Sequence, residues 1–319
     1  MADVIKCATR DAYGKALKEL GASGKDVLVL DADLAKATKT ITFKKDYPEK
    51  FIDCGIAEGN MMGIAAGLAT AGYTVFASSF AMFAAGRAFE QVRNSIAYPK
   101  LNVKIGATHA GISVGEDGAS HQCCEDIALM RSIPGMVIIN PADDVEAIAA
   151  VHAAAEHEGP VYMRFGRLAV PRVNSEDYKF ELGKGVELKG GKDVTIVATG
   201  LLVAPALEAA EALKAEGIDA RVINIHTIKP IDKEILIKAA KETGAIVTAE
   251  EHNVIGGLGG AVCEALSEEY PVPVVRLGVG DTFGKSGPAL ELLKIYGLDA
   301  ENIVKKAKTA IELKNKLGK

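Results

Sequence analysis

Short apolar runs alternate along the chain with longer segments whose apolar residues recur at helical spacing. In the first half, the runs that predict buried strands lie at 27–30, 51–56, 74–77, 103–105, 136–139 and 161–165. The segments that predict helices lie at 9–20, 60–72, 81–96, 125–133 and 142–157. This alternation is typical of a parallel sheet whose two faces are covered by helices.

The second half of the chain restarts the same alternation after a change of composition. Residues 171–192 are charged and glycine-rich and show no sustained helical periodicity. Beyond them, strands are predicted at 194–200, 221–226, 245–252 and 272–277, and helices at 203–215, after Pro230, after Gly257 and at 301–317. The pattern predicts an α/β protein of two domains, each a mostly parallel sheet flanked by helices, at 1–172 and 193–319 with a linker at 173–192.

Two segments of the first half are predicted to be loops. Residues 34–50 are polar and lack a clear period, and residues 107–122 form a long run punctuated by glycines. A loop of this length in a compact domain is usually either functional or disordered. The second loop contains two histidines, an aspartate and a glutamate, which favour a functional role.

The composition excludes several classes of function. The chain has 319 residues and a net charge of -5, which fits about two globular domains and gives no basic field for nucleic acid. It has no apolar run of about 18 residues, so no membrane span is predicted. Five cysteines without C-x-x-C spacing predict reduced thiols in a cytoplasmic protein. Adjacent Cys123 and Cys124 have no second ligand pair nearby, so no metal site is predicted in this chain.

Residues with useful chemistry follow the predicted strands. In an open α/β sheet, ligands bind at the edge formed by the carboxyl ends of the strands. The candidates at or just beyond these ends are Asp33, Glu58, Phe80, Phe83, His109, Asp117, His121 and Arg167. Arg164 lies on the same strand end as Arg167, and the sequence does not choose between the two arginines.

Most of these candidates also have an ordinary structural explanation. An acidic residue such as Glu58 is favoured at a helix start by the helix dipole. Phe80 and Phe83 are spaced like core residues on one helical face. The G-E-D-G run around Asp117 is turn chemistry, and Arg167 fits a surface ion pair.

Several segments, in this order along the chain, resemble those of the transketolases, a family of thiamine diphosphate enzymes. They are G-I-A-E-G-N at 55–60, S-S-F-A-M-F at 78–83, T-H-A-G-I-S-V-G-E-D-G-A-S-H-Q at 108–122, R-F-G-R at 164–167, I-K-P-I-D at 228–232, A-E-E-H at 249–252 and G-G-L-G-G at 256–260. The resemblance covers nearly the whole chain, and it implies a pyrimidine-binding domain followed by the family's C-terminal domain.

One part of the family pattern is missing. Full-length transketolases begin with a domain that binds the diphosphate through Mg²⁺, using a G-D-G run and a later asparagine. The G-E-D-G run at 115–118 lies on a different loop and does not match it. The chain is therefore similar to the C-terminal subunit of a split transketolase. The resemblance implies an N-terminal subunit as partner, which would bind most of the Mg²⁺ or other divalent cation, and a homodimer of this chain within an α2β2 assembly.

The resemblance implies cofactor contacts for four residues. Glu58 would hydrogen-bond a pyrimidine ring nitrogen of thiamine diphosphate and so promote ionisation of the thiazolium ring. Its neighbours in the sequence, C-G-I-A and M-M-G-I-A-A-G, are apolar, as such a carboxyl group requires. Phe80 and Phe83 would pack on the pyrimidine. Asp33 resembles an aspartate near the thiamine, and an ordinary strand-end loop explains it equally well.

Four residues are implied to contact the substrate. His109 would contact sugar hydroxyl or phosphate groups, and His121 would face the donor's oxygens beside the thiazolium ring. Asp117 would hydrogen-bond a sugar hydroxyl, and Arg167 could hold the sugar phosphate as a planar donor fork. Glu250, Glu251 and His252 are left out of the site because the family gives the C-terminal domain a structural role.

The implied reaction is reversible transfer of a two-carbon ketol unit between sugar phosphates, as in the pentose phosphate pathway. Three alternatives share the fold: the β subunit of a 2-oxoacid dehydrogenase first component, the C-terminal part of a deoxyxylulose-phosphate synthase, and a non-catalytic dimerising module. The T-H-A-G run at 108–111 favours transketolase over the synthase. The presence of Glu58, His109 and His121 argues against a non-catalytic module.

Overall fold

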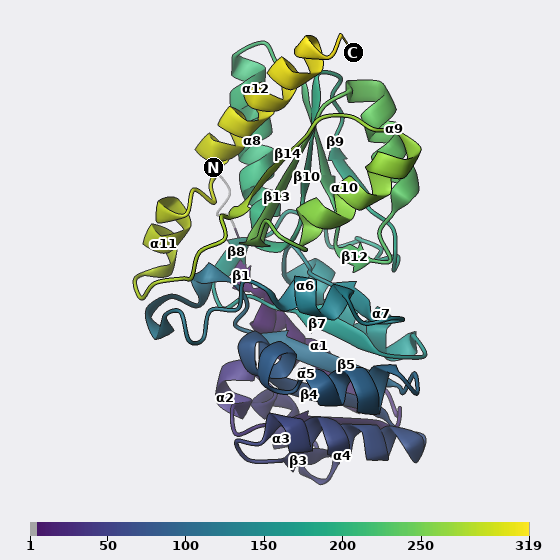
Figure 1. Cartoon of the computed structure of the whole chain (residues 1–319). Helices are drawn as coiled ribbons and strands as arrows, with labels where there is room; N and C mark the ends of the chain where they lie inside the picture. The colour runs from purple at the N-terminus through teal and green to yellow at the C-terminus, as the bar shows by residue number, and fades with distance from the viewer. Residues whose placement is uncertain (1–4, 319) are drawn as a thin grey trace.

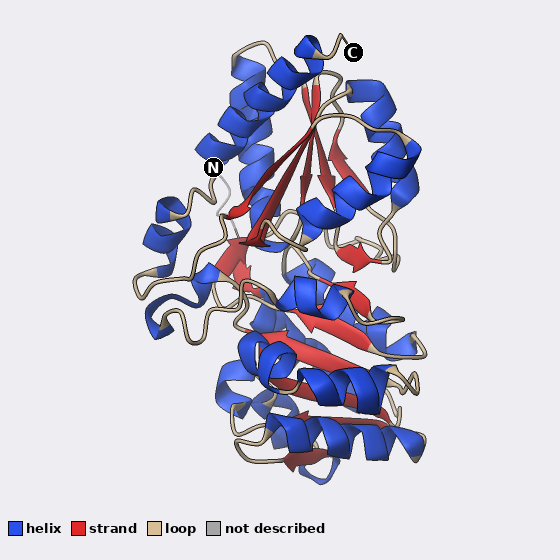
Figure 2. Ribbon diagram, in the orientation of Figure 1, coloured by secondary structure: helices blue, strands red, loops and turns tan. Residues whose placement is uncertain are grey.

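The molecule consists of two sheets, one above the other, each with helices on both sides (Figure 1). The computed structural model describes residues 5–318; residues 1–4 and 319, at the outer ends of the two expected domains, lie outside the described residues. Figure 2 shows the strands of each sheet as a separate stack. The predicted two-domain α/β fold with mostly parallel sheets is confirmed.

The first sheet has seven strands in the order β12-β6-β7-β5-β4-β2-β3. Six come from the first half and are parallel: β2 (Val27–Asp31), β3 (Phe51–Asp53), β4 (Thr74–Phe80), β5 (Val103–Thr108), β6 (Val137–Ile139) and β7 (Val161–Arg164). The seventh, β12 (Thr227–Lys229), comes from the second half and pairs antiparallel with β6. The apolar runs became strands because helices bury both faces of this sheet.

Two groups of helices cover the first sheet. One face packs against α1 (Thr9–Ala22), α3 (Ile41–Asp46) and α7 (Asp144–Glu156). The other packs against α4 (Glu58–Thr70), residues 81–97 and α6 (Asp126–Arg131). This second core continues into the helices of the upper domain, so the two halves share one hydrophobic cluster.

The second sheet has the order β14-β13-β10-β11-β9. Its strands are β9 (Val186–Lys189), β10 (Val194–Ala198), β11 (Ala220–Asn224), β13 (Ile246–Asn253) and β14 (Val274–Val279), and only β9 is antiparallel. One face is covered by α8 (Val203–Ala215) and α12 (Ala300–Lys316), and the other by α9 (Lys233–Thr243) and α10 (Leu258–Glu269). Three small elements complete the chain: β1 (Lys6–Ala8) paired with β8 (Ala169–Pro171), and α11 (Ala289–Ile295).

The loop expected over 34–50 is wrong, because the segment folds into short helices. They are α2 (Ala35–Thr38), α3 and a single 3-10 turn, Pro48–Lys50. The carboxylate of Asp31 organises this segment, since it accepts hydrogen bonds from the hydroxyls of Thr38 and Thr40 and from the Leu34 N–H. Helices this short are stabilised by such tertiary contacts rather than by a periodic apolar face.

Three other expected segments differ in detail. The regular helix expected at 81–96 is interrupted by two π-helical stretches, Met82–Arg87 and Val92–Ala97. The expected linker at 173–192 contains β9, which pairs with β11. The long loop at 107–122 begins with the last residues of β5 and contains a kinked 3-10 helix, Ile112–Asp117.

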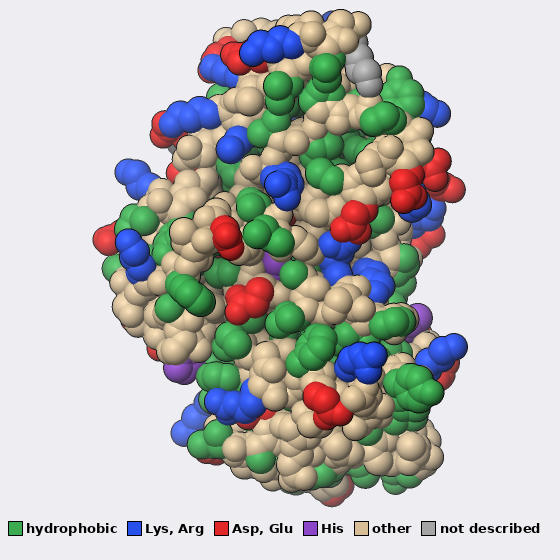
Figure 3. Space-filling model, viewed as in Figure 1, with side chains coloured by type: hydrophobic (Ala, Val, Ile, Leu, Met, Phe, Trp, Pro, Cys, Tyr) green, Lys and Arg blue, Asp and Glu red, His purple; other side chains and the backbone are tan. Residues whose placement is uncertain are grey.

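The surface shows no single-sign field on the face in Figure 3, where acidic and basic side chains are interspersed. Among the described helices, none is both long and apolar enough to cross a membrane. All five cysteines are free thiols. Burial raises the pKa of the Cys123 and Cys124 thiols, which keeps both protonated and makes them poor metal ligands.

Candidate active site

The candidate residues gather where four parallel strands of the first sheet end. The register aligns the end of β4 with the end of β5, because Phe80 lies opposite Thr108. Strand β7 ends beside them at Arg164, and β3 leads directly to Glu58. This carboxyl edge is the place at which an α/β sheet binds ligands.

Glu58 is the first residue of α4, and its side chain is only 1% exposed. Arg87 donates from Nη1 to its Oε2 at 2.8 Å, and the Ser79 hydroxyl lies 3.4 Å from Oε1. The helix cap is Ala57, without a side-chain hydrogen bond. The carboxylate therefore contacts side chains from another part of the chain instead of capping its own helix.

Four aromatic rings lie in series at this edge. Phe80 stacks on His109 with 3.8 Å between ring centroids, and it lies nearly parallel to Phe83 at 6.0 Å. The His121 ring meets Phe83 edge-on at 5.3 Å. The Arg87 guanidinium lies over the Phe83 ring, 4.5 Å from its centroid. Because Arg87 also donates to Glu58, it connects the ring cluster to that carboxylate.

His109 is held in an unusual backbone conformation and an unusual charge environment. Its φ is 57°, in the left-handed region that non-glycine residues seldom adopt. Arg10 Nη1 lies 2.8 Å from Nε2, and Thr108 Oγ1 lies 2.9 Å from Nδ1. Because arginine only donates, Nε2 accepts and the proton lies on Nδ1. Burial, together with the charges of Arg10 and Arg167, lowers the pKa of His109 to about 3, so the ring is neutral.

Arg10 is a site residue that sequence reasoning missed. It lies in the first turn of α1 and connects His109 to the carbonyl of Ala37 at 3.2 Å. A cation near a helix N-terminus opposes the helix dipole. This local misfit was the one signal in the sequence that could have marked it, since such misfits concentrate at functional positions.

The two arginines at the end of β7 have different environments. Arg164 is buried, donates to the buried Asp126 at 2.9 Å and also bonds the Glu251 carbonyl at 2.8 Å. Arg167 is 37% exposed, donates to the Val114 carbonyl at 2.6 Å and lies 3.7 Å from Asp117. Only Arg167 is free to meet a ligand, and it lies close enough to His109 to lower that ring's pKa.

Asp33 does not join the ring cluster. Its backbone is left-handed, with φ 62°, and its N–H donates to the Asp53 carboxylate at 3.1 Å. The exposed side chain lines a separate cavity of about 420 Å³ formed by the 33–37 segment with Ile41, Lys44 and Asp53. The carbonyl of Ala37, to which Arg10 donates, belongs to this segment and connects it to His109.

A cavity of about 390 Å³ lies next to His121, between residues of the two domains. It is lined by Met82, Ala119, Ser120, Gln122, Cys124, Glu125, Asn253 and residues 281–284. Within residues 5–318, no three His, Cys, Asp or Glu side chains gather closely enough to hold a metal ion.

Both halves of the chain match known protein families. Residues 5–172 match the family model "Transketolase, pyrimidine binding domain", and residues 183–303 match "Transketolase, C-terminal domain". The chain belongs to the transketolase family. All eight residues proposed for the site fall within the region matched to the pyrimidine-binding domain.

Several of its relatives within the transketolase family are proteins of similar length. A protein of Methanocaldococcus jannaschii named as a transketolase C-terminal section is 54% identical over 93% of this chain and 94% of its own length. A 6-deoxy-6-sulfo-D-fructose transketolase subunit of Clostridium sp. is 45% identical over 96% and 95%. A solved "split gene transketolase, inactive beta4 tetramer" is 60% identical with a TM-score of 0.91, covering 96% of this chain and 99% of that one. The chain is thus the C-terminal part of a split member of the family.

Proposed function

We propose that this chain is the catalytic C-terminal subunit of a thiamine diphosphate-dependent transketolase, which transfers a two-carbon ketol unit from a ketose phosphate to an aldose phosphate. The observation that carries the proposal is the buried carboxylate of Glu58, oriented by Arg87 next to the nearly parallel rings of Phe80 and Phe83. The transketolase relatives favour this reaction over the dehydrogenase and synthase alternatives.

The donor set at this edge fits an aminopyrimidine. A buried carboxylate supplies an acceptor for a protonated ring nitrogen, and the Phe83 ring supplies a flat apolar surface beside it. The residues described here contain no group that could hold a divalent cation. The proposal therefore assigns the diphosphate and Mg²⁺, or another divalent cation, to the N-terminal partner subunit.

When bound, the cofactor supplies the nucleophilic carbon that accepts the ketol unit. This chain's residues orient the cofactor and the sugar and exchange protons with them. Glu58 would accept a hydrogen bond from the protonated form of the pyrimidine nitrogen, and Phe80 and Phe83 would hold the ring in place. The neutral His109 is bonded at both nitrogens, so it positions the sugar rather than removing a proton.

His121 is suited to proton exchange with the sugar oxygens. Its Nδ1 lies 3.0 Å from the Ser120 hydroxyl, and within the described chain its Nε2 has no hydrogen-bonding partner. The ring is partly exposed and rests against Phe83. An imidazole with a free ring nitrogen facing the sugar can serve as a general acid or base.

The cations at this edge fit the anionic end of the sugar. Arg10 and Arg167 both lie near enough to His109 to lower its pKa, and Arg167 and Asp117 are within 3.7 Å of each other. A guanidinium pair binds a tetrahedral oxyanion such as phosphate. A sulfonate has the same shape, and the Clostridium relative is named for a sulfonated sugar, so a sulfosugar is a second donor candidate for the same residues.

The assembly proposed is a homodimer of this chain with two copies of the N-terminal subunit. Helix α4 is apolar but places Gly63 and Gly67 outward, where a Cβ would meet open space. Ile56 and Tyr98 on the same domain are 76% and 86% exposed. Exposed apolar residues of this kind fit subunit contacts, and the related split transketolase is described as an inactive beta4 tetramer, which supports contacts between copies of such a chain.

The test compares the chain alone with the chain mixed with a diphosphate-domain subunit. The lone chain is expected to bind thiamine diphosphate weakly and to transfer no ketol unit, and the mixture with Mg²⁺ is expected to do both. Donors that end in phosphate, in sulfonate or in a plain hydroxyl identify the preferred anion. Strong activity of the lone chain, or none in a mixture that binds cofactor, would contradict the proposal.

A further inference from the structure

The second domain contacts the loop that carries Asp117 and His121. Glu251, near the end of β13, accepts a hydrogen bond at Oε1 from the backbone N–H of Ser113, with 2.6 Å between the atoms. Both residues are buried, at 3% and 1% exposure. A bond from a backbone N–H to a buried carboxylate is one of the stronger attachments available to a loop.

The backbone at Gly111 shows how closely the loop approaches this carboxylate. Its φ is 80°, and a Cβ at this position would collide with the carboxyl group of Glu251. The loop therefore passes directly over the Glu251 side chain. Only glycine combines that backbone conformation with such a close approach.

The far end of the loop is attached to the second domain as well. Gln122 donates from Nε2 to the Lys285 carbonyl at 2.9 Å, and also to the carbonyl of Ile112 at 3.1 Å. A Cβ on Gly118 would collide with Ser286. The residues between these attachments include Asp117, which is exposed, and His121, which is partly exposed.

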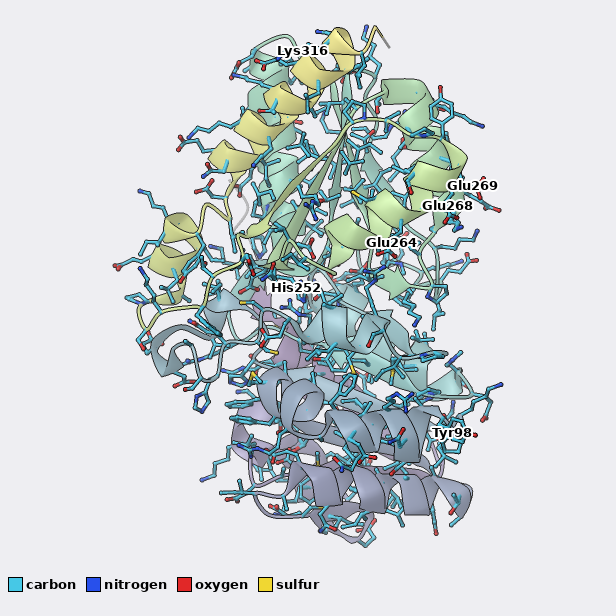
Figure 4. All side chains as sticks on the ribbon, viewed as in Figure 1. Tyr98, His252, Glu264, Glu268, Glu269 and Lys316 are labelled. Carbon is cyan, nitrogen blue, oxygen red and sulfur yellow. The ribbon has the colours of Figure 1, made fainter. Side chains whose placement is uncertain are left out.

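We propose that Glu251 is a positioning residue for the substrate loop, holding residues 111–118 so that Asp117 and His121 face the sugar. This inference rests on the proposed function. Arg164 fixes the backbone of Glu251, because its guanidinium donates to the Glu251 carbonyl and also to the Asp126 carboxylate. Figure 4 shows the next residue, His252, at the junction of the two halves. The second domain thereby takes part in substrate binding without contacting the substrate.

The adjacent Glu250 provides a matched control. It is equally buried, and successive residues of a strand point to opposite sides. Its carboxylate accepts from the N–H groups of Leu258 and Gly259, at 2.6 and 2.8 Å, at the start of α10 in its own domain. It has the charge and burial of Glu251 but no contact with the loop.

The experiment uses the full chain, mixed with a diphosphate-domain subunit, with Glu251→Ala, Glu251→Gln and Glu250→Gln. Glu251→Ala removes the acceptor, so KM for the donor sugar should rise by about tenfold or more, while the affinity for thiamine diphosphate is unchanged. Glu251→Gln keeps an acceptor oxygen and should restore most of the loss. Glu250→Gln should leave KM unchanged, even if it lowers the melting temperature.

Hydrogen exchange of the chain alone gives a readout that does not depend on catalysis. Amides at 111–118 should exchange about tenfold faster in Glu251→Ala and at the wild-type rate in Glu250→Gln. If Glu251→Ala does not fold, Glu251→Asp replaces it, because the shorter side chain keeps the charge but does not reach Ser113.

The two proposals fail in different ways. An unchanged KM and unchanged exchange at 111–118 in Glu251→Ala, or equal effects of the Glu250 and Glu251 variants, overturn the positioning role. No ketol transfer by the wild-type mixture overturns the proposed function instead. In that case hydrogen exchange still decides whether Glu251 holds the loop.

Discussion

The two sheets carry similar polar residues at their carboxyl edges but use them differently. At the first edge, Arg167 and His121 remain partly open to solvent. At the second edge, the strand-end side chains Thr199, Asn224, Glu250, Glu251 and His252 are all buried. Several of them bond the first domain: Thr199 donates to the Asn140 carbonyl, Asn224 donates to Glu146, and Glu251 accepts from Ser113.

This difference follows from what covers each edge. The carboxyl edge of the second sheet packs against the first domain. Across this junction, the backbone N–H of Asn140 donates to the His226 carbonyl at 2.8 Å. Thr199, Asn224 and Glu251 therefore bond protein partners across the junction, although the buried Oδ1 of Asn224 itself accepts no hydrogen bond from the described residues. We therefore predict that replacing a charged side chain by an uncharged one changes activity at the first edge. At the second edge the same kind of replacement should mainly change stability.

The largest effect is expected for Glu58→Gln. The amide keeps the size of the side chain but cannot exchange a proton with the pyrimidine, and loss of a positioned acid–base group costs about 10² to 10⁴ in rate. The measurement is deuterium exchange at the thiazolium carbon of bound cofactor in the complex, after the melting temperature has shown that the variant is folded.

Glu250→Gln is again the matched control, because it alters an equally buried carboxylate at the other edge. It should exchange deuterium at the wild-type rate. Wild-type exchange in Glu58→Gln would return that residue to a helix-start role, for which a stability change of at most about 1 kcal/mol is expected.

A smaller but still clear contrast is expected between Arg167 and Arg164. Arg167→Ala should raise KM for a phosphorylated donor about ten- to hundredfold and leave a donor without an anionic group unaffected. Arg164→Met leaves the buried Asp126 without its partner, so the free energy of unfolding should fall by about 3 to 5 kcal/mol. Steady-state kinetics and urea denaturation separate the two results. Because Arg164 also holds the backbone of Glu251, Arg164→Met should raise KM less than Arg167→Ala does, and equal effects of both variants on KM would mean that both arginines contact the substrate.

The smallest effect concerns two buried histidines, one from each edge. Burial, the largest cause for each, lowers the pKa of His109 to about 3 and that of His252 to about 4. Because both folded values lie below the ordinary value, each ring's contribution to stability is complete above about pH 6.5 and is lost as the pH falls towards the folded pKa.

Arg10→Ala distinguishes the two rings. It removes a nearby positive charge from His109 only, so the pKa of His109 should rise while that of His252 stays the same. An NMR titration of labelled histidines, run downward from about pH 8, measures both in one sample. If the pKa of His109 did not rise, Arg10 would not act on that ring through its charge. If the pKa of His252 changed as well, the effect of Arg10 would not be confined to His109.

Much of the fold could be predicted because its signals are local. The apolar runs and the helical period identified the parallel strands of both sheets, but not the antiparallel β9 and β12. The residues after each run pointed to the candidate ligand edge of the first sheet. The short helices of 35–46 were missed because Asp31 organises them through Thr38 and Thr40. The π-helical stretches at 82–87 and 92–97 were missed because the sequence period of a helix does not reveal a local widening of its turns.

The candidate site divides in the same way. Glu58, Phe80, His109 and His121 could be named from their segments, and the structure brings them to one place. Asp33 could also be named, but it lines a different cavity from the ring cluster. Glu251 was set aside as structural, and its contact with Ser113 gives that structural role a direct connection to the substrate loop.

The sequence by itself determined the two α/β domains and the chemistry available at the strand ends, since both depend on residue types at close spacing. Only the tertiary structure decided which groups meet: Arg87 with Glu58, 29 residues apart, Arg10 with His109, 99 apart, and Glu251 with Ser113, 138 apart. These pairs depend on the packing of whole sheets and helices, which positions side chains that no local period connects.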